Sequence, residues 1–338
     1  MDTISSISEL LSLSKSQYRI YDLSRTVTKL SKESFEKIEN NQLPYPTPNQ
    51  GHAHIAIAFW QENKAAPYLW FVKLPLDERG LLNQGARNHF IAIIMEALGN
   101  DLSQDPTEKQ EELLKSNPYH FTPSQYKLAY LNSELNYSLT KSSSQFLADC
   151  EKYFSGELGW DNWHNIGVQG ITDYVVRLND EKAKLQAICA AIPHLDKHVL
   201  SPLCSALENS SLSVELIEQL TGRFDSEEDS ATRLDLMRAL ATSSAHPFVI
   251  SLIENKLDDT ISEDMLIVIA GRNWQALAEQ SKMKKFLETL ASKGNMQLFA
   301  AIFKDLVSVP LLRPIMFACM RDNERSDDLG KAIGQLFN

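Results

Sequence analysis

The sequence predicts an α+β protein that is predominantly α-helical. A small N-terminal unit with an antiparallel sheet is expected to precede an all-helical array of the HEAT or armadillo kind. Segments within residues 17–74 show the alternation or the short apolar runs of strands. From Gly167 onward the apolar spacing is helical throughout, and three similar cores, 203–207, 236–240 and 266–270, recur at intervals of roughly 30 residues.

The chain of 338 residues is long for one hydrophobic core. We therefore predict an α+β unit over residues 1–100, a helical connector over 101–165, and an irregular α-solenoid of about five helical hairpins over 166–338. A compact helical bundle is the competing geometry for the last part, because the repeats are degenerate.

The first 100 residues supply the strands. An amphipathic N-terminal helix is expected, with Ser6 and Glu9 spaced as a capping box. Strands follow over 17–23 and 26–30, and a short helix over 31–40. The proline-rich stretch 43–51 is predicted to be an extended surface loop. Strands over 52–60 and 68–74 are expected to form a hairpin, covered by a helix whose apolar face runs from Leu82 to Ala97.

Three later helix starts carry capping signals. Asp105 with Glu108, Thr122 with Gln125, and Thr260 with Glu263 have the spacing of a capping box. Helices are expected at 123–137 and 143–155. Ten more are expected near 168–178, 181–191, 196–208, 212–222, 231–242, 247–257, 262–271, 281–292, 295–306 and 309–320.

Charge disfavours nucleic-acid binding. The net charge is −11, with acidic side chains in both halves of the chain, whereas nonspecific nucleic-acid binding depends on a concentrated basic face. Basic residues do gather in one stretch, interspersed with acids, and a solvated mixed surface is the favoured interpretation there: Arg19, Arg25, Lys29, Lys32 and Lys37.

Localisation and thiol state follow from simple patterns. No apolar run approaches the roughly 20 residues that span a bilayer, and the N-terminus lacks the pattern of a signal peptide. A cytoplasmic protein without a membrane partner is therefore expected. The four cysteines lie in helical patterns without a Cys-x-x-Cys pair, which predicts buried, reduced thiols.

The main candidate site lies in the segment 156–170. Four of the chain's 13 glycines and two of its five tryptophans fall there. Trp160 and Trp163, with Asp161 and His164, could hold a ligand or partner, or act in acid–base chemistry. The competing interpretation, which we favour, is a tight connector whose tryptophans anchor the first helical hairpin.

Other candidates are weaker. Arg79 and Arg87, near Gly80 and Gly85, suggest an anion site, but no phosphate-binding loop surrounds them, so no cofactor is predicted. The pair His52-x-His54 lacks a third ligand, so no metal site is predicted. Aromatic residues at 59–60 and 68–71 could stack single-stranded nucleic acid, but cross-strand pairs in a sheet core are favoured.

Two segments carry a resemblance. Residues 159–178 and 75–90 resemble an uncharacterised proteobacterial protein family, classified only as a domain of unknown function. The resemblance covers nearly the whole chain. It implies a bacterial, soluble protein and brings no catalytic or binding residue with it.

The function predicted from the sequence is a non-enzymatic interaction scaffold or adaptor that binds another protein through a helical-repeat surface. One rival is an enzyme of unknown class with an interdomain site drawing on Asp161, His164, and Arg79 or Arg87. Another is a nucleic-acid-associated factor using the basic residues of 19–37. The sequence does not fix the oligomeric state.

Overall fold

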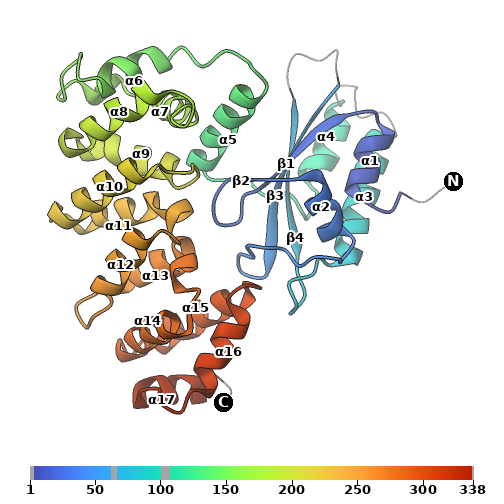
Figure 1. Ribbon diagram of the computed structural model, residues 1–338. Coiled ribbons are helices and arrows are strands. Elements are labelled where there is room, and N and C mark those ends of the chain that lie inside the picture. Colours follow the sequence, from blue (N-terminus) through green and yellow to red (C-terminus); the bar gives the residue numbers. More distant parts are fainter. Residues whose placement is uncertain (1–3, 62–66, 100–106, 337–338) are drawn as a thin grey trace. The chain divides into compact units, whose positions relative to one another are not determined.

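The computed structural model describes residues 4–61, 67–99 and 107–336, and these form two compact units (Figure 1). Unit 1 comprises Met1–Pro123 and Val307–Arg313, and unit 2 comprises Ser124–Leu306 and Pro314–Asn338. The boundary near residue 123 falls inside the range predicted as a connector.

Unit 1 contains a four-stranded antiparallel sheet in the order β2-β1-β3-β4. Its strands and helices are β1 (Gln17–Asp22), β2 (Thr28–Leu30), β3 (His52–Trp60), β4 (Tyr68–Pro75), α1 (Ile7–Leu13), α2 (Lys32–Glu39), α3 (Gln84–Leu98) and α4 (Glu108–Lys115). The predicted hairpin is confirmed, because β3 and β4 pair in register from His52↔Pro75 to Phe59↔Tyr68.

One face of this sheet builds the core of unit 1. Alternate residues of β3, from Ala53 to Phe59, are buried together with Ile20 of β1 and Val72 of β4. Side chains from α1, α2 and α3 complete this core. The period of two in each strand directs one set of residues to the helices, as the sequence pattern predicts.

The proline-rich stretch differs from the prediction of an extended surface loop. Tyr45 is fully buried, and its hydroxyl donates to the carboxylate of Asp22 at 2.6 Å. The Thr47 hydroxyl donates to the other oxygen of that carboxylate. The prolines exclude regular structure here, but polar contacts with a buried strand end hold the stretch against the sheet.

Unit 2 is helical, and its successive helices were largely predicted. They are α5 (Gln125–Ser138), α6 (Leu147–Phe154), α7 (Val168–Val175), α8 (Lys182–Ala191), α9 (Lys197–Leu207), α10 (Val214–Ser226), α11 (Ser230–Ala239), α12 (Pro247–Lys256), α13 (Glu263–Arg272), α14 (Gln280–Ser292), α15 (Met296–Ser308), α16 (Arg313–Arg321) and α17 (Asp327–Gln335). The last of these, α17, was missed, although Ser326 caps it and Leu329 and Ile333 are buried.

Alternate helices of unit 2 contact one another in two rows. One row runs through α7, α9, α11 and α13, and the other runs through α6, α8, α10 and α12 (Figure 1). This arrangement agrees with stacked helical hairpins. Assignment to the HEAT or armadillo kind stays a prediction. In the described part of the chain, no helix is both long and apolar enough to cross a membrane.

Three helix starts lie later than predicted. The caps are Thr107 for α4, Ser124 for α5 and Ser262 for α13. Before α5, the Phe121 amide donates to the Phe71 carbonyl at 3.3 Å, so the chain stays extended along β4 until the helix can begin. Before α13, Thr260 donates to Asp258 and leaves the capping role to Ser262. The predicted cap Asp105 lies outside the described residues.

Candidate functional site

The predicted segment 156–170 covers most of the connector between α6 and α7, with a single 3-10 turn over Trp163–Asn165, and the first turn of α7 from Val168. Gly156 and Gly159 have φ values of +79° and +75°, a backbone region that favours glycine. The Tyr153 hydroxyl donates to the Trp160 carbonyl at 3.1 Å and ties the connector back to α6. These turns place the two tryptophans of the segment near the turn between α8 and α9.

Trp163 lies in a stack of three rings. The His164 ring lies 3.9 Å from it, centroid to centroid, at 15°, and the His198 ring lies 4.3 Å away at 2°. Both histidines are exposed, while Trp163 is half-buried. His198 comes from the first turn of α9, so this stack joins the connector to the next helical hairpin.

Trp160 makes a second, similar contact. Its ring stacks on His194 with centroids 5.4 Å apart at 16° and meets Tyr153 edge-on at 5.7 Å. Asp161 is exposed. We call Tyr153, Trp160, Trp163, His164, His194, Asp196 and His198 the aromatic–imidazole cluster, and all of it belongs to unit 2.

The carboxylate of the cluster meets a histidine other than the predicted one. His198 Nδ1 lies 2.6 Å from Asp196 Oδ1, and the same oxygen accepts the His198 backbone amide at 2.8 Å. Asp196 is the N-cap of α9, and these hydrogen bonds lower the pKa of its carboxyl. The contact between Asp196 and His198 is therefore part of a helix cap on an open surface, while His164 stacks on the Trp163 ring.

Sequence reasoning found Trp160, Asp161, Trp163 and His164 but missed Tyr153, His194, Asp196 and His198. The missed residues lie on other elements, and the residue pattern within 156–170 does not indicate that they lie nearby. The one available signal was the Asp196 cap, which marks the start of α9 but does not indicate what packs beside it.

The two weaker candidates, Arg79 and Arg87, lie in different environments of unit 1. Arg79 is exposed and pairs with Asp77 at 3.3 Å. Arg87 is buried and donates to the Glu39 carbonyl, which joins α3 to the end of α2. Burial lowers the pKa of the Arg87 guanidinium. The Glu39 carboxylate accepts the amides of Ile7 and Ser8 at the start of α1.

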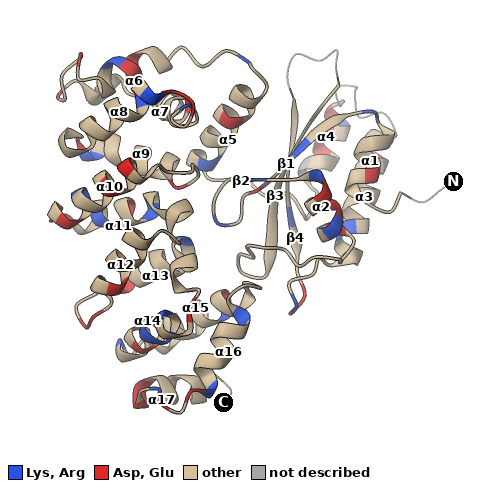
Figure 2. Ribbon diagram, in the orientation of Figure 1, with Lys and Arg blue, Asp and Glu red and all other residues tan. Residues whose placement is uncertain are grey.

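The basic residues of 19–37 do not form one exposed group. Arg19 lies over the Trp60 ring at 5.6 Å, and Lys32 lies over the Tyr18 ring at 4.0 Å. Lys37 pairs with Glu33 at 2.7 Å, and Arg25 is buried. Figure 2 shows basic and acidic residues interspersed along the helices of both units.

The predicted thiol environment is confirmed. All four cysteines are buried and free. Burial raises the pKa of the Cys150 thiol to about 12 and of the Cys189 and Cys319 thiols to about 11. Such thiols are poor nucleophiles and poor metal ligands at neutral pH. Across the described residues, no group of three or more His, Cys, Asp or Glu side chains is placed to hold a metal ion.

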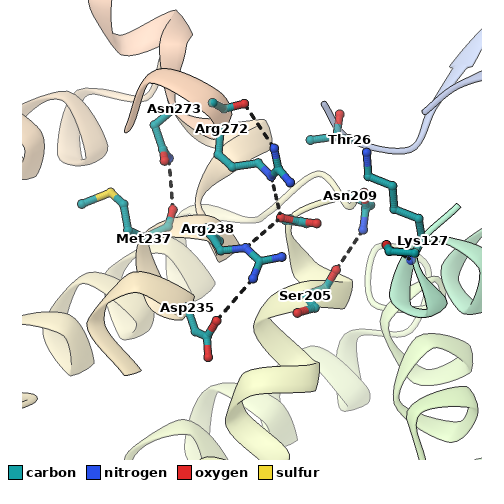
Figure 3. A network of polar contacts seen from close by, with 12 residues as sticks. Thr26, Lys127, Ser205, Asn209, Asp235, Met237, Arg238, Arg272 and Asn273 are labelled. Atoms are coloured by element: carbon teal, nitrogen blue, oxygen red, sulfur yellow. Dashed lines mark hydrogen bonds and ion pairs between the residues drawn. The ribbon is translucent and has the colours of Figure 1, made fainter. Parts of the chain in front are cut away.

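A buried carboxylate with two arginine partners connects three helices of unit 2. Glu208, at the end of α9, is 1% exposed, and its Oε2 lies 3.0 Å from Arg272 Nε and 3.4 Å from Arg238 Nε. Figure 3 shows Arg238 and Arg272 side by side, with Arg238 also reaching Asp235. This network joins α9, α11 and α13, so we assign it a structural role in the stacking of these helices.

The model of a family described as "Protein of unknown function (DUF3549)" matches residues 2–337. No curated protein and no solved structure matched significantly.

Proposed function

The chain belongs to the DUF3549 family, whose description assigns no activity, and from its geometry we propose a protein–protein interaction scaffold. In this proposal unit 2 presents its helices to another protein, and the aromatic–imidazole cluster is the contact. The stack of His164, Trp163 and His198 at the surface of unit 2 carries the proposal. A cytoplasmic location belongs to the same proposal.

The chemistry of the cluster suits binding. Tryptophan is among the residues most enriched at the energetic centres of protein interfaces, because it buries a large rigid area at a small cost in side-chain entropy. Trp163 is held in place by the two imidazoles, so its orientation is fixed before a partner arrives. A fixed orientation reduces the entropic cost of association.

Further apolar side chains extend the available surface. Val214 and Phe248 are 52% and 45% exposed and lie in the first turns of α10 and α12, which contact each other. Ile267 of α13 is 46% exposed. Single exposed apolar residues are common on soluble proteins. Val214 and Phe248 lie on helices that contact each other, so this pair supports a contact surface that extends over α10 and α12.

The enzyme alternative has one specific observation in its favour, the close contact between His198 and Asp196. A histidine oriented by a carboxylate is a common general base. Both side chains are exposed by 41% or more, however, and a general base is expected in a cleft that excludes water. The helix cap accounts for the same contact, so binding is the better-supported proposal.

The test is an affinity purification of the tagged full-length protein from its own lysate, at low and moderate salt. The compared chains are the wild type, Trp163→Ala and Phe317→Ala. Phe317, 43% exposed on α16, is the matched control for losing an aromatic ring from unit 2. We expect a partner that wild type and Phe317→Ala retain and that Trp163→Ala binds at least tenfold less.

Circular dichroism separates loss of folding from loss of binding. If Trp163→Ala does not fold, the double variant His164→Ala/His198→Ala replaces it, because both histidines are exposed. A partner that binds all variants equally would exclude the cluster as the contact. The absence of any reproducible partner for the wild type would contradict the scaffold proposal.

A further inference from the structure

The outer edge of β4 in unit 1 is paired over only part of its length. β4 is the last strand of the sheet, so one of its edges pairs with β3 and the other faces outward. On the outer edge, the segment 119–121 forms a short antiparallel pairing with residues 71–73. The Lys73 amide, for example, donates to the Tyr119 carbonyl at 2.7 Å. This pairing covers the second half of the edge and stops before the first half.

The first half of the edge has backbone groups that can pair with a further strand. In an antiparallel sheet, the amide and the carbonyl of every second residue point to the same side. Phe71 and Lys73 bond outward to the segment 119–121, so the amide and the carbonyl of Leu69 also point outward. Among the described residues, none bonds to either of these Leu69 groups or to the Phe71 amide. An open sheet edge of this kind is a template for strand addition.

A cavity of about 250 Å³ lies along the same half of the edge. Five consecutive residues of β4, 68–72, line it. Successive side chains of a strand point to opposite faces, so a wall made of successive residues lies along the strand edge, where the backbone itself is reached from the side. Burial agrees with this placement, because the residues from Tyr68 to Phe71 are half-buried, whereas Val72 is buried.

The side of the cavity toward the helices is apolar. Tyr68 and Trp70 line it on the face of the sheet that packs against the core, together with Phe59 of β3. The opposite wall comes from α3 and α4: Phe90, Ile94, Leu98 and Leu114. A cavity of about 150 Å³ lined by leucine, isoleucine and phenylalanine is large enough for benzene. The cavity beside β4 therefore has room for one large apolar side chain.

Open backbone groups beside an apolar cavity are the two features by which a sheet edge binds an extended peptide. We propose that the first half of the β4 edge binds an extended segment of a partner protein, and that one large apolar side chain of this segment enters the cavity. The residue opposite Trp70 supplies that side chain, because paired residues share a sheet face. The segment 119–121 shows the same mode of pairing on the adjoining half of the edge.

This peptide site lies within unit 1, whereas the contact in the proposed function lies within unit 2. The two are independent, and Trp163→Ala should bind the peptides described next as the wild type does. Loss of one site therefore leaves the other to be judged by its own experiment.

The probes are three uncharged seven-residue peptides with blocked ends. Each has threonine at six positions and leucine, phenylalanine or tryptophan at the centre, and a peptide with threonine at the centre is the apolar control. Binding to the full-length protein is measured by isothermal titration calorimetry. We expect at least one probe to bind, and the control to bind at least tenfold more weakly, because it leaves the cavity without an apolar side chain.

Methylation of the peptide backbone tests the pairing directly. With the central side chain opposite Trp70, the amides of the two flanking residues face Leu69 and Phe71, while the central amide faces away from β4. Methylating the two flanking amides should weaken binding at least tenfold, since the methyl groups replace both donors. Methylating the central amide is the matched control and should leave binding nearly unchanged. Equal affinities of the two methylated peptides would exclude backbone pairing.

Variants of the protein locate the site. Leu69→Pro removes the outward amide, and proline is accepted on an edge strand because that amide takes no part in pairing with β3. This variant should bind at least tenfold more weakly. Leu69→Ala keeps the amide and is the matched control. Leu114→Trp fills the cavity and should abolish binding, whereas Leu113→Trp adds the same ring to α4 outside the cavity wall and should not.

Circular dichroism shows whether each variant folds, and the methylated peptides test the same bonds on the wild type if Leu69→Pro does not. Equal binding by Leu69→Pro and Leu69→Ala would place the contact elsewhere. Self-association of the wild type in sedimentation, lost in Leu69→Pro, would show that a second copy of the chain occupies the edge instead. If none of the three probes binds, the edge is not a peptide site.

Discussion

At the scale of single residues, the buried carboxylate of Asp22 in unit 1 is held by hydrogen bonds from its neighbours. Asp22 is 3% exposed, and its carboxylate accepts from Tyr45, Thr47 and the Ser24 amide. Burial raises the pKa of the Asp22 carboxyl above its usual value, and these hydrogen bonds reverse part of that rise. A raised pKa means that folding favours the protonated acid.

The pH dependence of stability should therefore have a definite sign at Asp22. The contribution of a raised carboxyl pKa is complete below the unfolded-state pKa and is lost as the pH rises through the folded-state pKa. Asp22→Asn does not titrate, so its free energy of unfolding should increase relative to wild type between pH 4 and pH 7. Urea unfolding at several pH values measures this difference.

Glu33→Gln is the control with the opposite sign. The hydrogen bond from Lys37 lowers the pKa of the exposed Glu33 carboxyl. The free energy of unfolding of this variant should therefore decrease slightly relative to wild type as the pH rises over the same interval. A difference for Asp22→Asn that stays constant with pH would contradict a raised pKa at Asp22.

The buried thiols give a second prediction at this scale. Because burial raises their pKa values and shields them, the four native cysteines should react with a disulfide reagent only on unfolding. The absorbance of the thiolate that the reagent releases should show almost no reactive thiol in buffer and all four in denaturant. Leu311→Cys, at a residue 56% exposed, should add one fast-reacting thiol. Fast reaction of the wild type would show that a helix opens readily.

At the scale of elements, helix packing depends on a few close approaches. A Cβ added at Gly170 in α7 would lie 2.5 Å from the Phe146 carbonyl oxygen and 2.7 Å from Cys150 Sγ. The glycine is thus needed for α7 to contact α6, and no turn or unusual φ accounts for it. Gly222 in α10 is exposed and has no such neighbour.

The two glycines should respond in opposite directions to alanine. Gly170→Ala should lower the free energy of unfolding by about 1–3 kcal/mol, because the close contact forces the helices apart. Gly222→Ala should raise it by up to about 1 kcal/mol through the higher helix propensity of alanine. Urea unfolding with circular dichroism measures both. Stabilisation by Gly170→Ala would mean that α7 does not approach α6 this closely.

The ion pair of Glu208 predicts strong coupling among α9, α11 and α13. Removing both arginines would leave a buried carboxylate without these partners, so Arg238→Ala/Arg272→Ala should cost about 3–5 kcal/mol. Glu208→Gln should cost less, about 1–3 kcal/mol, because the freed arginines are partly exposed and can be hydrated. Chemical unfolding of each variant provides the values.

A surface ion pair supplies the comparison. Lys331 pairs with Asp328 at 3.4 Å, and both side chains are more than half exposed. Lys331→Ala should change stability by less than about 0.5 kcal/mol. If the double arginine variant is as mild as Lys331→Ala, the network in Figure 3 contributes little to stacking of these helices.

At the scale of the whole molecule, the chain combines a small sheet unit with a helical unit, and charge is spread over both (Figure 2). The net charge of −11 keeps the chain from presenting a broadly basic face, and the basic residues of 19–37 are divided among rings, acids and the interior. The proposed function therefore rests on aromatic rings, namely the stack at the surface of unit 2.

The order and type of nearly every element could be predicted from the sequence. Strand alternation and helical apolar spacing are local periodicities, set by the geometry of each backbone conformation and visible within ten residues or so. These periodicities predicted the hairpin of β3 and β4 and ten consecutive helices of unit 2. Helix α17 was missed because it is short and polar between its few buried residues.

What the sequence could not determine is which side chains meet across elements. The predicted caps at Thr122 and Thr260 gave way to Ser124 and Ser262, because pairing with β4 and a local Asp258 contact took precedence. His198 and Trp163 are 35 residues apart, and only the packing of α8 and α9 against the connector stacks their rings. Local propensity extends over a few residues, whereas a site depends on contacts between distant segments, and those are decided by tertiary structure alone.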